Sequence, residues 1–242
     1  MIITHLFFLL SALSRFESVP NALCKTKESE IGDFTNLVLA TFYLPTHCLR
    51  DNPKPAVGPV RGAPEFTIHG LWPGRTADDW PQCCSPESIH RASQLRNVTD
   101  LVKYWVSTKG SDDKLWAHEW EKHGTCGMNL FRTENAYFNA TVELLKRIQL
   151  DRILYKYGIQ PSSKEYSNQL VSSIFNRALH YKPILECSTI NQTSYLSGLY
   201  VCLDVLWPYD VVACPSDYYI SKQNNCPDKF RIPPYPSSCF RS

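Results

Sequence analysis

The sequence contains few glycines, no internal repeat and almost no excess of one charge. Only 10 of 242 residues are Gly, and no heptad spacing of apolar residues occurs, which excludes collagen-like and coiled-coil folds. The net charge of +2 is far below that of proteins that coat nucleic acid, although an enzyme that binds and releases a polyanion needs no such excess. The 13 Tyr, 11 Phe and 6 Trp exclude a disordered chain and predict one globular domain.

No apolar run beyond the N-terminus is long enough to be a membrane anchor. The first 13 residues, MIITHLFFLLSAL, have the length of a signal-peptide core and are too short to span a bilayer. We expect a signal peptide over 1–19, cleaved between Ser14 and Leu23, and a single domain over 24–242. This interpretation predicts a secreted product, and a lysosomal or vesicular destination is an open alternative.

The ten cysteines include no C-x-x-C pair, which disfavours structural zinc and favours disulfides. Three sequons, at Asn97, Asn139 and Asn191, fit the same oxidising secretory route. We therefore expect a glycoprotein whose domain is stabilised by disulfides.

Helical and strand patterns follow one another without regular βαβ order, which predicts an α+β fold. The expected strands cover 37–43, 66–72, 184–188, 199–204 and 211–214. The expected helices cover 112–126, 133–157 and 162–180, with a separate helix starting at Asp151 as the alternative for the second of them. Ser162 and Glu165 have the spacing of a capping box for the last helix. In the strand over 66–72, strict alternation places His69 and Leu71 on one face and Gly70 on the other.

The segment HEWEKHGTC, residues 118–126, concentrates residues suited to acid–base chemistry. At about 100° per residue, His118, Glu119, Lys122 and His123 share one face of a helix. Imidazoles titrate near neutral pH, and a Lys ammonium stabilises charge that develops on a phosphodiester. Because the segment offers no nucleophile, the substrate must supply one, and RNA has its 2′-hydroxyl. The segment indicates phosphoryl transfer without a metal, although most such patterns are simply solvated helix faces.

A zinc protease and purely structural roles are the alternatives for these two regions. A zinc protease requires His at positions i and i+4, but Lys122 stands at i+4 and His123 follows one residue later. In FTIHGLWP, residues 66–73, His69 lies near the end of a strand and Trp72 can stack on a base. A structural histidine and a core tryptophan are the more ordinary explanations of that segment.

FTIHGLWPG and HEWEKHGTC resemble the two active-site segments of the T2 ribonucleases, acid endoribonucleases of secretory and lysosomal compartments. The first segment departs from the family only at Gly74, where an acidic residue is usual. The resemblance extends from about Leu37 to Tyr235. It implies a central antiparallel sheet packed by helices, no cofactor or metal, and a single-stranded RNA substrate rather than DNA.

The same resemblance implies a role for each motif residue. His69 and His123 are the expected acid–base pair, and Glu119 is the acidic residue that assists at the phosphate. Substrate binding is expected from Trp72, His118 and Lys122. The implied reaction is transesterification through a 2′,3′-cyclic phosphate to 3′-phosphate ends. Base preference and the identity of the first-step base stay open.

The family's cysteine pattern also implies a set of disulfides: Cys202–Cys214, Cys187–Cys226, and Cys126 with Cys83 or Cys84. A family cysteine between Cys48 and the first motif is missing here, while Cys24 and Cys239 are additional. We expect Cys24 to pair with Cys48. Cys239 then either pairs with the remaining member of 83 and 84, or links two chains of an otherwise monomeric protein.

A rival from another class is a secreted glycoprotein signal in which catalysis is secondary. The sequons and the additional cysteines fit that role as well as they fit an enzyme. Comparing a glycan-free protein with a His123 variant in one cellular assay would separate the two.

Overall fold

The computed structural model describes residues 23–51, 59–95, 98, 100–107, 109–221 and 224–240, and a six-stranded sheet forms its centre. The strand order is β2-β1-β5-β6-β3, with β4 also paired to β5. The strands are β1 (Asn36–Tyr43), β2 (Phe66–Gly74), β3 (Glu165–Ser167), β4 (Ile184–Ile190), β5 (Thr193–Leu203) and β6 (Lys229–Arg231). Their pairings are antiparallel apart from one parallel contact between β5 and β6. The expected signal peptide and the sequon at Asn97 lie outside the described residues.

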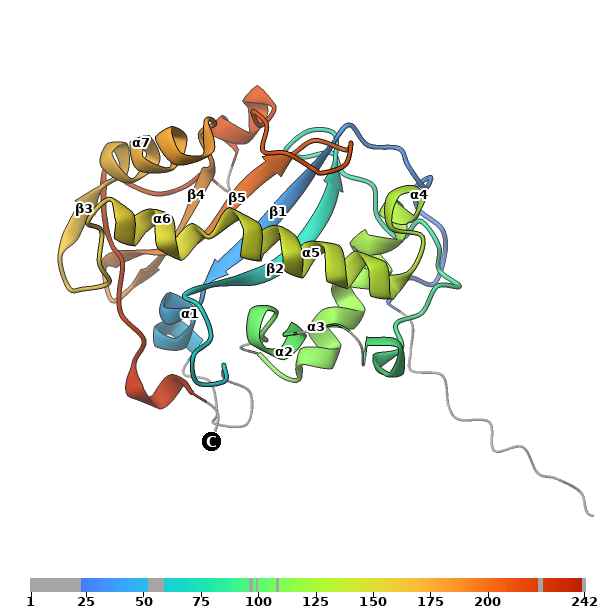
Figure 1. Cartoon of the computed structure of the whole chain (residues 1–242), viewed down its shortest axis with the longest axis horizontal. Helices are drawn as coiled ribbons and strands as arrows, with labels where there is room; N and C mark the ends of the chain where they lie inside the picture. Colours follow the sequence, from blue (N-terminus) through green and yellow to red (C-terminus); the bar gives the residue numbers. More distant parts are fainter. Residues whose placement is uncertain are drawn as a thin grey trace, which may run out of the picture.

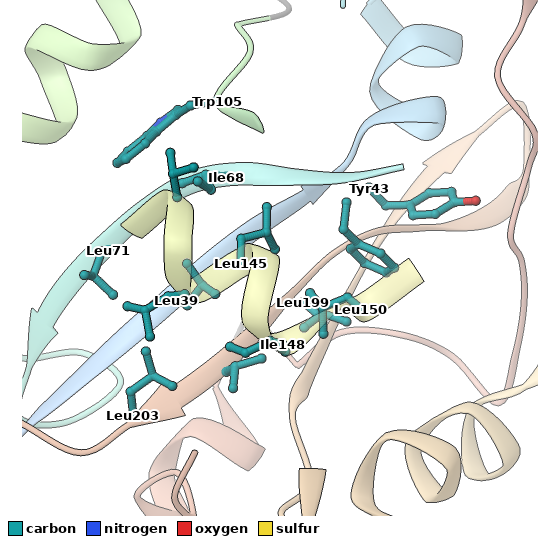
Figure 2. Packing of buried hydrophobic residues seen from close by; sticks show 14 of the residues in the cluster. Leu39, Tyr43, Ile68, Leu71, Trp105, Leu145, Ile148, Leu150, Leu199 and Leu203 are labelled. Atoms are coloured by element: carbon teal, nitrogen blue, oxygen red, sulfur yellow. The ribbon is translucent and has the colours of Figure 1, made fainter. Parts of the chain in front are cut away.

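Two consecutive helices, α5 (Glu134–Ile148) and α6 (Leu150–Lys156), cross one face of this sheet (Figure 1). The main hydrophobic core lies between them and the strands. Figure 2 shows residues of this layer from the helices and from β1 and β5: Leu145, Ile148, Leu150, Leu39, Leu199 and Leu203. Each fully buried leucine contributes about 2 kcal/mol to stability. The expected α+β fold, with an antiparallel sheet packed by helices, is confirmed.

The other helical segments are mostly short. They are α1 (Leu44–Asp51), α2 (Leu101–Tyr104), α3 (Asp112–His118), α4 (Met128–Phe131), α7 (Asn168–Leu179), the π turn η2 (Glu119–His123) and the 3₁₀ turns η1 (Ala92–Leu95), η3 (Gly124–Gly127), η4 (Ser216–Ile220) and η5 (Ser237–Cys239). Within the described ranges, no helix has both the length and the apolar character needed to cross a membrane.

Two predicted helices differ in their limits. The helix expected over 133–157 is divided at Gln149, whose φ of 55° is left-handed. The helix expected to begin at Ser162 begins instead at Asn168, because 165–167 pair with β6 as strand β3. The capping role passes to Ser167, whose Oγ accepts a hydrogen bond from the Leu170 N–H at 3.1 Å.

The hairpin of β4 and β5 turns at the sequon of Asn191. Asn191 and Gln192 have φ values of 47° and 64°, and the flanking Ile190 and Thr193 pair directly. Positive φ at both central residues is the geometry that a two-residue hairpin turn favours. Asn191 is exposed there, so the turn presents a glycosylation acceptor to solvent. The strand expected over 211–214 is wrong, since Val211 forms only an isolated bridge to Leu203.

All ten cysteines are paired in the structure. The pairs are Cys24–Cys83, Cys48–Cys239, Cys84–Cys126, Cys187–Cys226 and Cys202–Cys214. The expected pairs at 187–226 and 202–214 are present, and Cys84 is the partner of Cys126.

The expected pairing of Cys24 with Cys48 is wrong, because the fold places these residues in different clusters. Cys48, on α1, packs with Leu44, Val106 and Cys239. Cys24 instead lies beside the π turn, with its Sγ 3.4 Å from the Glu121 carbonyl oxygen. Cys83, the member of the 83/84 pair that was expected to be available for Cys239, is bonded to Cys24. Cys239 is bonded to Cys48, so it is not left for a link between chains.

Candidate active site

A cavity of about 240 Å³ lies between β2 and the helical segment formed by α3 and η2. The six residues singled out from the two sequence motifs all line it: His69, Trp72, His118, Glu119, Lys122 and His123. The fold therefore brings together two segments that are about fifty residues apart in the chain.

A β-bulge aims the residues of β2 into this cavity. Ala40 pairs with Gly70 and Thr41 with Ile68, so that His69 is an extra residue in its strand. Residues on either side of a bulge no longer alternate strictly. As a result Leu71 joins the core, whereas Gly70 faces the site with His69, which corrects the alternation predicted from sequence.

Gly70 is required by the close approach of two cavity side chains. A Cβ built at this position would overlap the Glu119 Oε2 and the Trp72 Nε1. These two atoms form a hydrogen bond in which the indole N–H donates to the carboxylate at 2.7 Å. The absence of a side chain at Gly70 therefore allows the two motifs to be joined directly.

The helical segment changes from α to π geometry at the site. The π turn Glu119–His123 is followed at once by a 3₁₀ turn. Because an i→i+5 turn is wider than an α-turn, it brings His123 round to His118, with ring centroids 6.0 Å apart. π turns occur often at functional sites. The helical segment expected over 112–126 is confirmed, but only 112–118 is an α-helix, and the π and 3₁₀ turns follow it. The four polar residues share the cavity as predicted.

Covalent and hydrogen bonds fix the end of this segment. Cys126 is bonded to Cys84, and the Cys83 N–H donates to the Lys122 carbonyl at 2.8 Å. At Gly124, a Cβ would come within 2.6 Å of the Trp120 ring. The Gly-Thr-Cys sequence therefore packs the π turn tightly against its neighbours.

One imidazole from each motif packs against the same indole. The Trp72 ring lies 4.9 Å from the His69 ring and 5.3 Å from the His123 ring, measured between centroids. Phe42 stacks on the other side of His69 at 4.2 Å. The side chain of His69 keeps 30% of its surface exposed, so it is held firmly and still reaches the cavity.

Glu119 is completely buried, and one of its oxygens has no hydrogen bond. This oxygen, Oε1, lies 3.7 Å from His69 Nε2 and 4.0 Å from His118 Nε2. Burial raises the pKa of Glu119 to about 8, against the smaller opposing effects of Trp72 and Lys122. The carboxyl group is therefore protonated at neutral and acidic pH, and can donate a hydrogen bond into the cavity.

The pKa values of the histidines are shifted in the opposite direction. Burial, with smaller contributions from the nearby His47, His118 and Lys122, lowers the pKa of His69 to about 3. Burial also lowers the pKa of His123 well below 6.5, with Lys122 again adding to the effect. Its Nδ1 is buried without a partner. An anion in the cavity would counter these cationic neighbours and favour the imidazolium form.

Two tyrosines in the cavity wall were not found from sequence. Tyr200 on β5 packs its ring 5.8 Å from that of Trp72, and Tyr218 comes from the 3₁₀ turn η4. Neither residue belongs to a motif, and Tyr200 reaches the site because its strand pairs with β1 at Ala40. Only knowledge of the strand order could have identified it.

Comparison with known proteins agrees with this geometry. The sequence profile described as "Ribonuclease T2 family" matches residues 34–210. Extracellular ribonuclease LE of Solanum lycopersicum is 30% identical over 207 residues, which cover 82% of this chain and 85% of that protein. Intracellular ribonuclease LX of the same species is 30% identical over 190 residues, covering 75% and 76% of the two chains.

A solved structure is also similar. The crystal structure of RNase NT in complex with 5′-AMP superposes with a TM-score of 0.71 at 27% identity, covering 84% of this chain and all of that one. A metalloprotease is therefore excluded, and the rival of a glycoprotein signal is not favoured. With a family match over most of its length, the chain belongs to the ribonuclease T2 family and is a T2-type endoribonuclease.

Proposed function

We propose that this enzyme cleaves single-stranded RNA by transesterification, in which the 2′-hydroxyl attacks the adjacent phosphate. The observation that carries the proposal is the convergence of His69, Glu119, Lys122 and His123 on one cavity. These groups supply proton transfer and charge stabilisation, which are what an internal attack on a phosphodiester requires. Our expectation is that no metal takes part, because the attacking oxygen belongs to the substrate.

His69 and His123 are the proposed proton carriers. One, as neutral imidazole, takes the proton of the 2′-hydroxyl, and the other, as imidazolium, gives a proton to the leaving 5′-oxygen. The products are a 2′,3′-cyclic phosphate and a free 5′-hydroxyl. The second step reverses the roles, with water attacking the cyclic phosphate to leave a 3′-phosphate.

The remaining motif residues are proposed to act on the phosphate. Lys122 offsets the charge that builds up on the non-bridging oxygens. Glu119, protonated through its raised pKa, donates a hydrogen bond from its unpaired oxygen, and His118 stands 4.0 Å from that oxygen as a further phosphate contact. Trp72 holds Glu119 in place through its indole N–H and offers its partly exposed ring to the substrate.

Secretion is part of the proposal. Five disulfides support folding in an oxidising compartment, and they agree with a signal peptide over 1–19 and a catalytic domain over 24–242. Asn191, exposed in its hairpin turn, and Asn139, half-buried on α5, are the proposed glycosylation sites within the described residues. Detection of glycans on the protein recovered from culture medium would test both statements.

Product analysis on a short synthetic RNA tests the reaction. We expect a 2′,3′-cyclic phosphate that is later converted to a 3′-phosphate, at equal rates with and without a chelator. RNA methylated at the 2′-oxygen and DNA of the same sequence should not be cut. Cleavage of the methylated RNA at the rate of ordinary RNA would refute the mechanism, and inhibition by the chelator would refute its independence from metals.

A further inference from the structure

A second and larger hollow lies on the opposite face of the sheet from the active site. Its volume is about 880 Å³, and it is lined by the C-terminal ends of α5 and α7 and by residues along the whole of α6. The active-site cavity is lined by Val38 and Tyr200, whereas α5 and α6 pack with the alternate strand residues Leu39 and Leu199. In Figure 1, α6 and α7 accordingly lie far from α3.

The lining of this hollow is strongly basic. We call it the basic groove, and its basic residues are Arg147, Arg152, Lys156, Arg177 and His180, with Asp210 as the single acidic residue in the lining. All five basic residues are exposed. Within the described residues, none of the four Lys and Arg side chains forms an ion pair with a carboxylate. In a chain of net charge +2, this is a local concentration of uncompensated charge.

The helix ends alone do not account for this concentration. Arg147, Lys156 and Arg177 lie in the last turns of their helices, where a cation favourably meets the negative end of the dipole. That effect needs neither a hollow nor convergence of three helices on it. Arg152, two residues into α6, is not in a last turn and still lines the groove. The arrangement fits an anion with several charges.

Aromatic rings lie among these cations. Tyr157 and Tyr181 line the groove, and 41% of Tyr181 is exposed. Gln149 and Arg152 also line a neighbouring hollow of about 350 Å³, which Tyr104 shares. Basic grooves with interspersed aromatic rings bind single-stranded nucleic acid, because the cations follow the phosphates and the rings stack on bases.

We propose that the basic groove binds a segment of single-stranded RNA remote from the bond that is cleaved. The proposal rests on the proposed function in taking RNA as the ligand, but it assigns no chemistry to the groove. Its consequence for catalysis is selective: long RNA gains affinity from the second site, whereas a dinucleotide can occupy only the active site. The groove thus favours polymeric substrate through KM and leaves turnover of short substrates unchanged.

Binding of 2′-O-methyl RNA tests this proposal without relying on cleavage. The variant Arg152→Glu/Arg177→Glu is compared with the control Lys164→Glu/Lys229→Glu, which makes the same charge change at exposed residues outside the groove. We expect the groove variant to bind an oligomer of about 20 nucleotides at least about tenfold more weakly, with a salt slope smaller by about 0.7 for each phosphate that the groove no longer neutralises. Affinity for a dinucleotide and cleavage of a dinucleotide should match wild type.

Several outcomes would overturn the proposal. Equal losses in the groove variant and the control would show an effect of net charge alone. Unchanged binding of the oligomer by the groove variant would show that the groove does not bind RNA. If the wild-type protein binds a heparin oligosaccharide more tightly than the RNA oligomer, and the groove variant loses that binding, the groove is assigned to a sulfated glycan. If charge reversal unfolds the protein, Arg152→Gln/Arg177→Gln replaces it, with a smaller loss expected. Because cleavage is not the readout, failure of the proposed mechanism would leave this result intact.

Discussion

Two buried clusters in this protein combine histidine with carboxylates, and they are built in opposite ways. In the active site, Glu119 has an oxygen without a hydrogen bond and His123 a nitrogen without one. In the other cluster, His90 contacts the Glu134 carboxylate through Nδ1 and Asp113 through Nε2, the latter at 2.8 Å. The first cluster leaves polar atoms available for a ligand, and the second leaves none on its imidazole.

The pKa values of the histidines also differ between the two clusters. Burial alone would lower the pKa of His90, but its hydrogen bonds with Glu134 and Asp113 raise it overall. Burial lowers the pKa of His69 and His123 without such compensation. The comparison predicts that His90, held between carboxylates, stabilises the fold, whereas His69 and His123, which lack such partners, serve the reaction. It can be tested at both clusters.

The largest effect is expected from removing either proposed proton carrier. His69→Ala and His123→Ala should each reduce kcat/KM by about 10³-fold or more, since general acid–base catalysis contributes about 10² to 10⁴-fold. Circular dichroism and melting temperature should remain close to wild type, because neither imidazole satisfies a buried partner. Near-normal activity in either variant would remove that residue from the mechanism.

The converse is expected at the structural cluster. His90→Ala should lower the free energy of unfolding by about 3 kcal/mol, because it leaves the buried Glu134 carboxylate without its charged partner. Since the pKa of His90 is raised in the fold, its stabilisation is complete below about pH 6.5 and declines as pH rises. Denaturant melts at several pH values would measure this, and kcat at a low temperature should change little. A loss that grows toward alkaline pH contradicts the assignment.

The buried carboxyl group of Glu119, which the proposed mechanism uses, is expected to destabilise the folded protein. Its raised pKa of about 8 means that the folded protein loses stability as pH rises from about 4.5 to 8. Glu119→Gln should therefore be more stable than wild type by about 4 kcal/mol near pH 7.5, and similar to it near pH 4.

The same variant should be less active. Gln can still accept the Trp72 hydrogen bond, so its loss of activity would report the acidic proton rather than a displaced indole. Glu119→Asp is the matched control, because it keeps the acid and shortens its reach. A Glu119→Gln enzyme that is fully active, or less stable at pH 7.5, would contradict this account of the buried carboxyl group.

The smallest effect expected is in the pH dependence of the wild-type rate. Because burial lowers the pKa of both His69 and His123, neither is protonated at neutral pH before substrate binds, and acidification supplies the imidazolium that the leaving group needs. A bell-shaped profile of kcat/KM with its maximum below pH 6.5 should result, falling about tenfold per pH unit on the alkaline side. Measurements of kcat/KM in buffers from pH 3.5 to about 8.5 at constant ionic strength test this profile. A value of kcat/KM that stays constant through pH 8 would contradict the scheme.

Sequence predicted which residues share the candidate site most directly where these residues are close along the chain. His118, Glu119, Lys122 and His123 stand within six residues, so local spacing placed them together even though the turn proved to be π rather than α. The shift of Leu71 to the core was not predictable from alternation, because the bulge at His69 depends on how β1 pairs with it. Local patterns do not contain strand register.

The disulfides and the rest of the cavity show the same limit. Cys24 and Cys48 are near each other in sequence, but their partners lie on segments that only the completed fold brings near. Tyr200 lies in the cavity wall because its strand, β5, pairs with β1. The basic groove is likewise formed where α5, α6 and α7 meet, and its basic residues are scattered from 147 to 180 in the sequence.

The overlap of two crosslinks has a consequence for damaged molecules. The loop closed by Cys24–Cys83 begins before Cys48 and ends within the loop closed by Cys48–Cys239. A protease that cuts one peptide bond anywhere from 24 to 239 therefore cannot release a fragment, since at least one of these bonds bridges the break. Nicked protein would migrate as a single species on a non-reducing gel and separate into two pieces only after thiol treatment.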